Sequence, residues 1–182
     1  MAETRKGSQL PTQSVILPYE LTRGQESIDI YNSTGRTAQE WQELLTYDIL
    51  AVNNEGLWVH TKFGYSVPCR NGKNEIVIMR ELYGIMQGER ILHTAHRTTT
   101  SHAAWERLCI LLDKANIKYK SIKATGREAI YVKDSDARAE FRTRLSKGGL
   151  GEGFNLLVID EAQDYSRSSG YTNVAVNVAY IV

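Results

Sequence analysis

Strand-like and helix-like segments alternate along most of this 182-residue chain, and their order limits the folds that the chain can adopt. Two segments have helical patterns, residues 73–87 and residues 98–113. The segments with strand patterns are short and either apolar or alternating: residues 56–68, 90–95, 117–125, 128–134, 139–146 and 155–160. This alternation predicts an α/β domain that has a mostly parallel sheet with helices on both faces.

The segments before residue 56 and after residue 160 extend this alternation of strands and helices in different ways. Residues 1–14 are polar and predict a flexible arm, so we assign the folded domain to residues 15–182. Residues 35–52 predict a further helix, because Thr37 and Glu40 have capping-box spacing ahead of an apolar stripe. The C-terminal segment VAVNVAYIV has strong strand character and low charge, and we expect it to pair beside the strand that precedes Asp160.

The composition is that of a globular protein, with 42% apolar and 24% charged residues. The net charge of +1 gives no overall basic excess, so DNA binding would need a local basic patch. Cys69 and Cys109 have no metal-binding spacing and suit a reducing cytoplasm. No apolar run approaches the ~18 residues of a membrane span, and the N-terminus lacks the apolar core of a signal peptide. We therefore expect no membrane partner.

The segment VPCRNGKNEI, residues 67–76, links a predicted strand to a predicted helix. Gly72 and Lys73 fit the end of the P-loop pattern G-x-x-x-x-G-K-[ST], whereas Asn74 stands in place of the serine or threonine. The N–H groups and the dipole at a helix N-terminus favour an anion, and a lysine there can reach nucleotide phosphates. A plain surface turn gives the same short pattern, so this loop alone does not decide the function.

A second segment, LLVIDEAQ, is a buried-type strand that ends in the adjacent carboxylates of Asp160 and Glu161. Such a pair is costly at the end of a buried strand unless the carboxylates have partners or a function. In phosphoryl-transfer ATPases one carboxylate holds Mg²⁺, and a nearby acidic residue orients the attacking water. Ligands of parallel sheets bind at the carboxyl ends of the strands, which is where we expect both this pair and the loop before residue 74.

Four segments together resemble the ATPase domain of the large terminase subunits of tailed bacteriophages, the motors that package viral DNA. PCRNGKNE resembles the variant P-loop of that family, and GRTAQEWQ resembles its adenine-side motif. LHTAHRTTTSHAAWERL resembles the strand and helix after the P-loop, and LLVIDEAQDY resembles the acidic strand end. The resemblance runs from about Tyr19 to Tyr165 and implies a P-loop NTPase fold of the RecA/ASCE type.

The resemblance also implies residue roles in binding ATP. Gln42 would contact adenine, with Trp41 packing nearby, and Lys73 would bind phosphate. The other nucleotide-binding residues would belong to the loop itself: Pro68, Cys69, Arg70, Asn71, Gly72 and Asn74.

For catalysis the resemblance implies that Asn74 and Asp160 hold Mg²⁺ and that Glu161 is the catalytic glutamate. Many terminases have an arginine where this chain has Cys69, so the adjacent Arg70 would have to stabilise the charge of the transition state. Lys73 completes the predicted catalytic set.

The partners implied by the resemblance are double-stranded viral DNA, the portal protein and the small terminase subunit, in a ring on the portal within the host cytoplasm. We see neither the coupling motif nor the nuclease domain of that family after Tyr165. Two alternatives therefore stay open beside the packaging ATPase. One is a truncated terminase fragment or binding module with little turnover, and the other is a helicase-like ATPase domain, because the letters DEAQ also resemble a DEAD-box motif.

Overall fold

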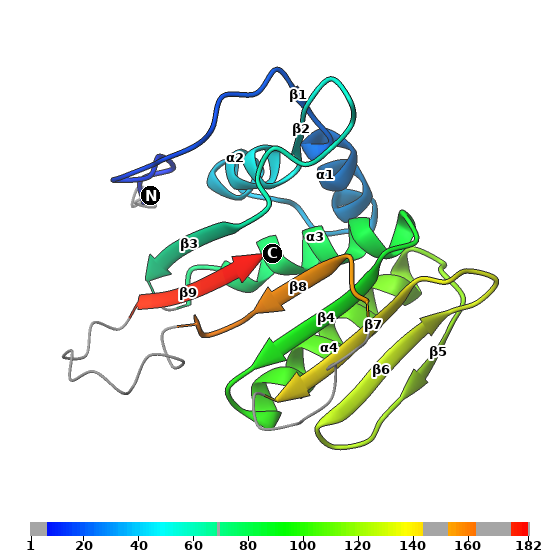
Figure 1. Ribbon diagram of the computed structural model, residues 1–182. Coiled ribbons are helices and arrows are strands. Elements are labelled where there is room, and N and C mark those ends of the chain that lie inside the picture. Colours follow the sequence, from blue (N-terminus) through cyan, green and yellow to red (C-terminus); the bar gives the residue numbers. More distant parts are fainter. Residues whose placement is uncertain (1–6, 69, 144–152, 163–175, 182) are drawn as a thin grey trace, which may run out of the picture.

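A computed structural model describes residues 7–68, 70–143, 153–162 and 176–181 (Figure 1). The prediction of an α/β fold is confirmed. The main sheet is built from seven strands: β3 (Phe63–Pro68), β4 (Arg90–Ala95), β5 (Tyr119–Ile122), β6 (Arg127–Val132), β7 (Arg138–Thr143), β8 (Leu156–Ile159) and β9 (Val176–Ile181). Their order across the sheet is β3, β9, β8, β4, β7, β6, β5.

The sheet is mixed, so the prediction of a mostly parallel sheet is wrong. Strand β4 pairs in parallel with β7 and β8, whereas the other neighbouring strands pair antiparallel. Short turns join β5 to β6 and β6 to β7, and a connection of a few residues can join only antiparallel strands. The C-terminal strand β9 lies antiparallel between β3 and β8, which confirms that this segment pairs beside the strand preceding Asp160.

Strand directions bring the two predicted site segments to one edge of the sheet. Because β9 is antiparallel to both β3 and β8, these two strands point the same way. Strand β8 is also parallel to β4. The carboxyl ends of β3, β4 and β8 therefore lie at the same edge, where β3 leads toward Lys73 and β8 leads directly into Asp160.

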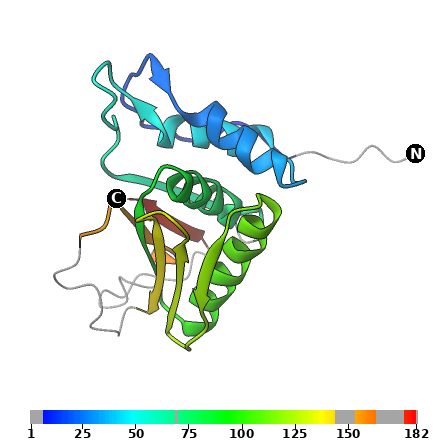
Figure 2. The same cartoon turned by 90° about the vertical axis from the view of Figure 1, so that its right-hand side faces the viewer.

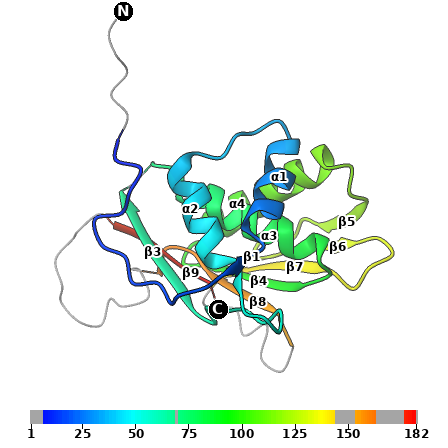
Figure 3. The same cartoon turned by 90° about the horizontal axis from the view of Figure 1, so that it is seen from above.

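In the described part of the chain, four helices accompany the sheet: α1 (Gly24–Ser33), α2 (Glu40–Ile49), α3 (Lys73–Met86) and α4 (Thr98–Lys114). Helices α3 and α4 pack against the sheet and against each other on the same face, and α1 and α2 pack on α3 (Figures 2 and 3). Within the described ranges no helix covers the opposite face, so the prediction of helices on both faces is not met there. A small antiparallel sheet, β1 (Leu21–Thr22) with β2 (Ala51–Val52), flanks α1 and α2.

Several elements differ in detail from the predicted ones. Helix α2 begins at Glu40 and its capping box joins Gln39 to Gln42, so the predicted box between Thr37 and Glu40 is wrong. Helix α1 was not predicted at all. The glycine-rich segment KGGLGEGF, residues 147–154, suggests a loop in the sequence but lies mostly outside the described residues.

Helix α3 is the centre of the hydrophobic core. It is enclosed by α1 and α2 on one side and by the sheet and α4 on the other, so apolar residues occur around most of its circumference. Met79 and Leu82 have no solvent exposure, and the buried hydroxyl of Ser27 in α1 donates to the Met79 carbonyl. No helix in the described part of the chain is both long enough and apolar enough to span a membrane.

Candidate functional site

The site is centred on Lys73, the first residue of helix α3. The preceding Gly72 has a φ of 85°, a left-handed conformation that favours glycine. This conformation turns the chain sharply between the end of β3 and the helix. The Lys73 side chain consequently starts at the helix N-terminus and lies only 5% exposed.

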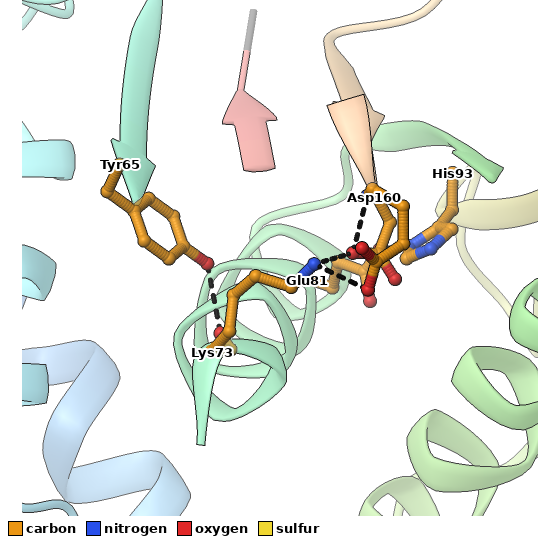
Figure 4. A network of polar contacts seen from close by, with 6 residues as sticks. Tyr65, Lys73, Glu81, His93 and Asp160 are labelled. Carbon is orange, nitrogen blue, oxygen red and sulfur yellow. Dashed lines mark hydrogen bonds and ion pairs between the residues drawn. The ribbon is translucent and has the colours of Figure 1, made fainter. Parts of the chain in front are cut away.

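The Lys73 ammonium binds both carboxylates of the acidic pair (Figure 4). Its Nζ atom lies 2.6 Å from Asp160 Oδ1 and 3.0 Å from Glu161 Oε1. The Asp160 side chain is only 2% exposed, whereas that of Glu161 is 24% exposed. Residues 87 positions apart in sequence thus form one buried ion-pair network, in which Asp160 Oδ1 also accepts the backbone N–H of Glu161.

The backbone around this network is held in a fixed geometry. The hydroxyl of Tyr65, in β3, donates to the Lys73 carbonyl at 2.9 Å (Figure 4). Burial raises the pKa of Tyr65 well above its usual value, and the nearby charges of Asp160 and Glu81 raise it further, so the hydroxyl keeps its proton. Glu161 has a φ of 54°, an unusual left-handed conformation for a residue other than glycine.

Asn74 lies beside the network with an unused oxygen. Its buried Oδ1 atom has no hydrogen-bond partner among the described residues. Asn74 and Asp160 line one small cavity, together with Val77, Ile78, Glu81, His93, Ala104 and Arg107. Three side chains with oxygen atoms, those of Asn74, Glu81 and Asp160, therefore line one cavity, and oxygen atoms are the ligands that Mg²⁺ prefers.

A second buried charge pair borders the same cavity. His93 Nδ1, in β4, lies 2.6 Å from Glu81 Oε1, in α3, and both side chains are 2% exposed. Burial alone would lower the pKa of His93, but the charge of Glu81 and the hydrogen bond to it outweigh this, so the pKa is raised above 6.5. Asp160 adds to the increase, and Lys73 opposes it.

Two contacts connect the GRTAQEWQ segment to the start of α3. The Gln42 side chain donates from Nε2 to the Gly72 carbonyl at 3.2 Å, while its Oε1 accepts the Gln39 backbone N–H at 2.9 Å. Arg36 forms an ion pair of 2.6 Å with Glu75, one residue after Asn74. The structure thus brings together the two segments predicted to bind adenine and phosphate.

The other predicted residues are less closely connected to Lys73. Trp41 is half-buried near Gly72, Pro68 and Asn71 are exposed, and the Asn71 amide donates to the Pro68 carbonyl. Arg70 is exposed, has a φ of 63° and forms no ion pair with any described residue. Cys69 lies outside the described residues. The structure therefore groups Lys73, Asn74, Asp160 and Glu161 but leaves Arg70 apart.

Sequence analysis missed Tyr65 and the Glu81–His93 pair. Their signal was weak, because a glutamate in a largely apolar stretch of helix and a histidine in a short strand are each unremarkable in a sequence. Only their joint placement on two buried elements indicates an ion pair.

Comparisons with known proteins do not assign this site: no protein-family model, no curated protein and no solved structure matches the chain. Among the described residues there is also no cluster of three or more histidine, cysteine, aspartate or glutamate side chains that could hold a metal. Only the chemistry of the site itself therefore bears on the function.

Proposed function

We propose that this chain is a P-loop ATPase domain that resembles the motor domain of the terminase large subunit and hydrolyses ATP. One observation carries the proposal. A lysine at a helix N-terminus, after a left-handed glycine, makes ion pairs with two adjacent carboxylates at the end of another strand. A buried cation, the N-terminus of a helix and two carboxylates suit the binding of a nucleoside triphosphate with its metal ion.

The Lys73 ammonium is the group we assign to phosphate binding. Its present partners are Asp160 and Glu161, so the phosphate oxygens would replace at least one carboxylate around Nζ. The N–H groups at the start of α3 would donate to the same phosphates. The turn at Gly72 places both the Lys73 ammonium and the N–H groups of the helix N-terminus at the same position.

Asn74 and Asp160 are the residues we assign to Mg²⁺. The unpartnered Oδ1 of Asn74 and the carboxylate of Asp160 line one cavity, and Mg²⁺ commonly takes one or two protein oxygens, with water and phosphates as the other ligands. A metal ion held by these two residues would supply positive charge that offsets the charge developing on the phosphates. Asp160 would then exchange its lysine partner for a cation of higher charge.

Gln42 is suited to recognising adenine. One N–H of its amide and one lone pair of its oxygen are used by Gly72 and Gln39, which leaves one donor and one acceptor position. Adenine presents an acceptor at N7 beside a donor at N6, whereas guanine presents two acceptors at the corresponding positions. The remaining capacity of Gln42 therefore matches adenine, and because the residue is only 3% exposed, the segment around it would have to move for adenine to reach the amide.

Glu161 is the residue we assign to orienting the attacking water. It is the more exposed of the two carboxylates. We expect Glu161→Gln to abolish ATP hydrolysis while ATP still raises the melting temperature, because the amide keeps the size of the side chain but cannot act as a base. A variant that hydrolyses ATP at the parental rate would show that this role is wrong.

A nucleotide-binding module with little turnover is the second candidate. The observation that favours it is the exposed Arg70, which lies outside the ion-pair network and so leaves no arginine assigned to the developing charge. Melting curves and turnover assays on the same purified chain separate the two candidates. ATP at ~100 times its dissociation constant should add roughly 2.7 kcal/mol of stability, with turnover for the ATPase and without it for the module.

The partners that we propose depend on the family resemblance alone. They are double-stranded viral DNA, the portal protein and the small terminase subunit, with the subunits arranged as a ring in the host cytoplasm. Salt-dependent binding of the chain to duplex DNA is the simplest check, because contacts to phosphates weaken steeply as salt rises.

A further inference from the structure

We propose that the Glu81–His93 pair holds one fixed water molecule against the Asn74 side chain and thereby positions Asn74. The water site follows from the nucleotide-free structure alone. Its consequence for magnesium binding rests on the proposed function.

The three side chains share one side of the protein interior. Asn74 and Glu81 are seven residues apart in helix α3, which is about two helical turns, so they lie on the same face of the helix. His93 reaches this face from the neighbouring strand β4 and makes its contact with Glu81 through Nδ1 (Figure 4). The other ring nitrogen, Nε2, is therefore directed away from Glu81.

Two buried polar atoms at this place have no protein partner. His93 Nε2 and Asn74 Oδ1 are both buried without a hydrogen bond to the described residues, and both residues line the same cavity. Buried polar groups in native proteins are nearly always paired with protein or with ordered water. Two unpaired polar atoms at the same cavity indicate that they share one hydrogen-bond partner.

The cavity has the size of that partner. Its volume of about 10 Å³ is close to the smallest space that holds a single water molecule. A water molecule can donate to the Asn74 carbonyl oxygen and can pair with His93 Nε2 whether that nitrogen carries a hydrogen or a lone pair. Asp160 borders the same cavity and offers a third polar contact, so the requirement of two to four polar partners is met.

The water gives His93 a positioning role. Glu81 fixes the orientation of the imidazole ring, the ring fixes the water, and the water fixes the rotation of the Asn74 amide next to Lys73. If Asn74 binds the metal as proposed, its oxygen is already oriented before the metal arrives. Outer residues of this kind are known to tune metal affinity through the ligands that they orient.

The first test is a high-resolution crystal structure of the chain without nucleotide or divalent cation. We expect a water molecule within hydrogen-bond distance of both His93 Nε2 and Asn74 Oδ1. An empty cavity, or a direct hydrogen bond between the two side chains, would overturn the inference.

The second test is a double-mutant cycle on unfolding, also without nucleotide. His93→Leu and Asn74→Ala each remove the bridge, so the double variant loses it only once. We expect a coupling of roughly fivefold or more in the unfolding equilibrium constant. His102→Leu is the matched control, because His102 also pairs with a buried glutamate, Glu128, but lies outside this cavity; its effect should add to that of Asn74→Ala.

Additive effects of His93→Leu and Asn74→Ala, within about twofold, would contradict the inference. If His93→Leu does not fold, the crystal structure of the parental chain still decides. Binding of Mg²⁺ with ADP is measured separately on the parental chain. A parental chain that shows the water but binds no nucleotide refutes the proposed function alone, whereas nucleotide binding without the water or the coupling refutes this inference alone.

Discussion

The replacement Lys73→Met tests whether the buried ammonium is the electrostatic centre of the site. Methionine keeps much of the length of the side chain and removes only the charge and the hydrogen bonds. The variant leaves the Asp160 carboxylate 2% exposed and without its cation. Asp160 then retains only its contact with the Glu161 backbone N–H as a stabilising partner in the network.

The structure gives the magnitude of this effect. At an effective dielectric constant of about 20, charges separated by 2.6 Å attract with roughly 6 kcal/mol. Much of that attraction offsets the cost of removing both ions from water. Removing one partner leaves the cost without the attraction, so we expect Lys73→Met to lower the free energy of unfolding by about 3–5 kcal/mol.

Urea unfolding at neutral pH, followed by circular dichroism and without nucleotide, measures this loss. The double variant Lys73→Met/Asp160→Asn should be more stable than Lys73→Met, because it no longer buries an unpaired carboxylate. Lys62→Met, at an exposed lysine, is the control and should change stability by less than about 0.5 kcal/mol. The reasoning is refuted if Lys73→Met matches this control or if the second replacement lowers stability further.

Two more replacements test other parts of the structure. Gly72→Ala should lose about 1–2 kcal/mol for its left-handed backbone and more for crowding, because the new Cβ atom would lie 2.8 Å from Gln42 Nε2. Gly56→Ala, with a φ of 77° and open space around it, measures the backbone part alone in the same urea assay, and equal losses would rule out the crowding. Burial raises the pKa of Asp48, and the Tyr19 hydrogen bond and the His60 charge reverse only part of this increase. The folded protein therefore binds the proton more tightly than the unfolded chain does, and the free energy of unfolding falls as pH rises from about 3.8 through the folded pKa. Asp48→Asn should remove that part of the pH slope in urea titrations, and an unchanged slope would contradict it.

Local sequence patterns were sufficient for most of the elements around the site. Helix α3, strand β4 and helix α4 have strong periodicity, and the structure confirms them nearly to the residue. Local patterns could not predict whether the strands pair in parallel or antiparallel. The order of elements along the chain does not determine which strands become neighbours in the sheet. Strand β9 shows this most clearly, since its insertion between β3 and β8 makes two antiparallel pairs from one apolar segment.

The residues of the candidate site were also predictable from the sequence, whereas most of the contacts between them were not. Lys73 and the Asp160–Glu161 pair were predicted because each stands at a strand end, where sheet proteins place ligands. The mutual contact of these residues and the hydrogen bond from Gln42 to the Gly72 carbonyl depend on three-dimensional packing. Likewise, Asn74 was predicted as a metal ligand, but its link to a cavity shared with His93 follows only from the fold.

The position of β9 has a consequence for how the site is assembled. The strands that lead to Lys73 and to Asp160 are not hydrogen-bonded to each other; the strand between them comes last of the three in the chain. During synthesis from the N-terminus, the lysine and the carboxylate strand ends therefore emerge well before the element that sets the spacing of their strands. The pairing of residues 176–181 thus completes the frame of the site, and the electrostatic centre of the protein depends on a segment that is made after both of the charged partners it brings together.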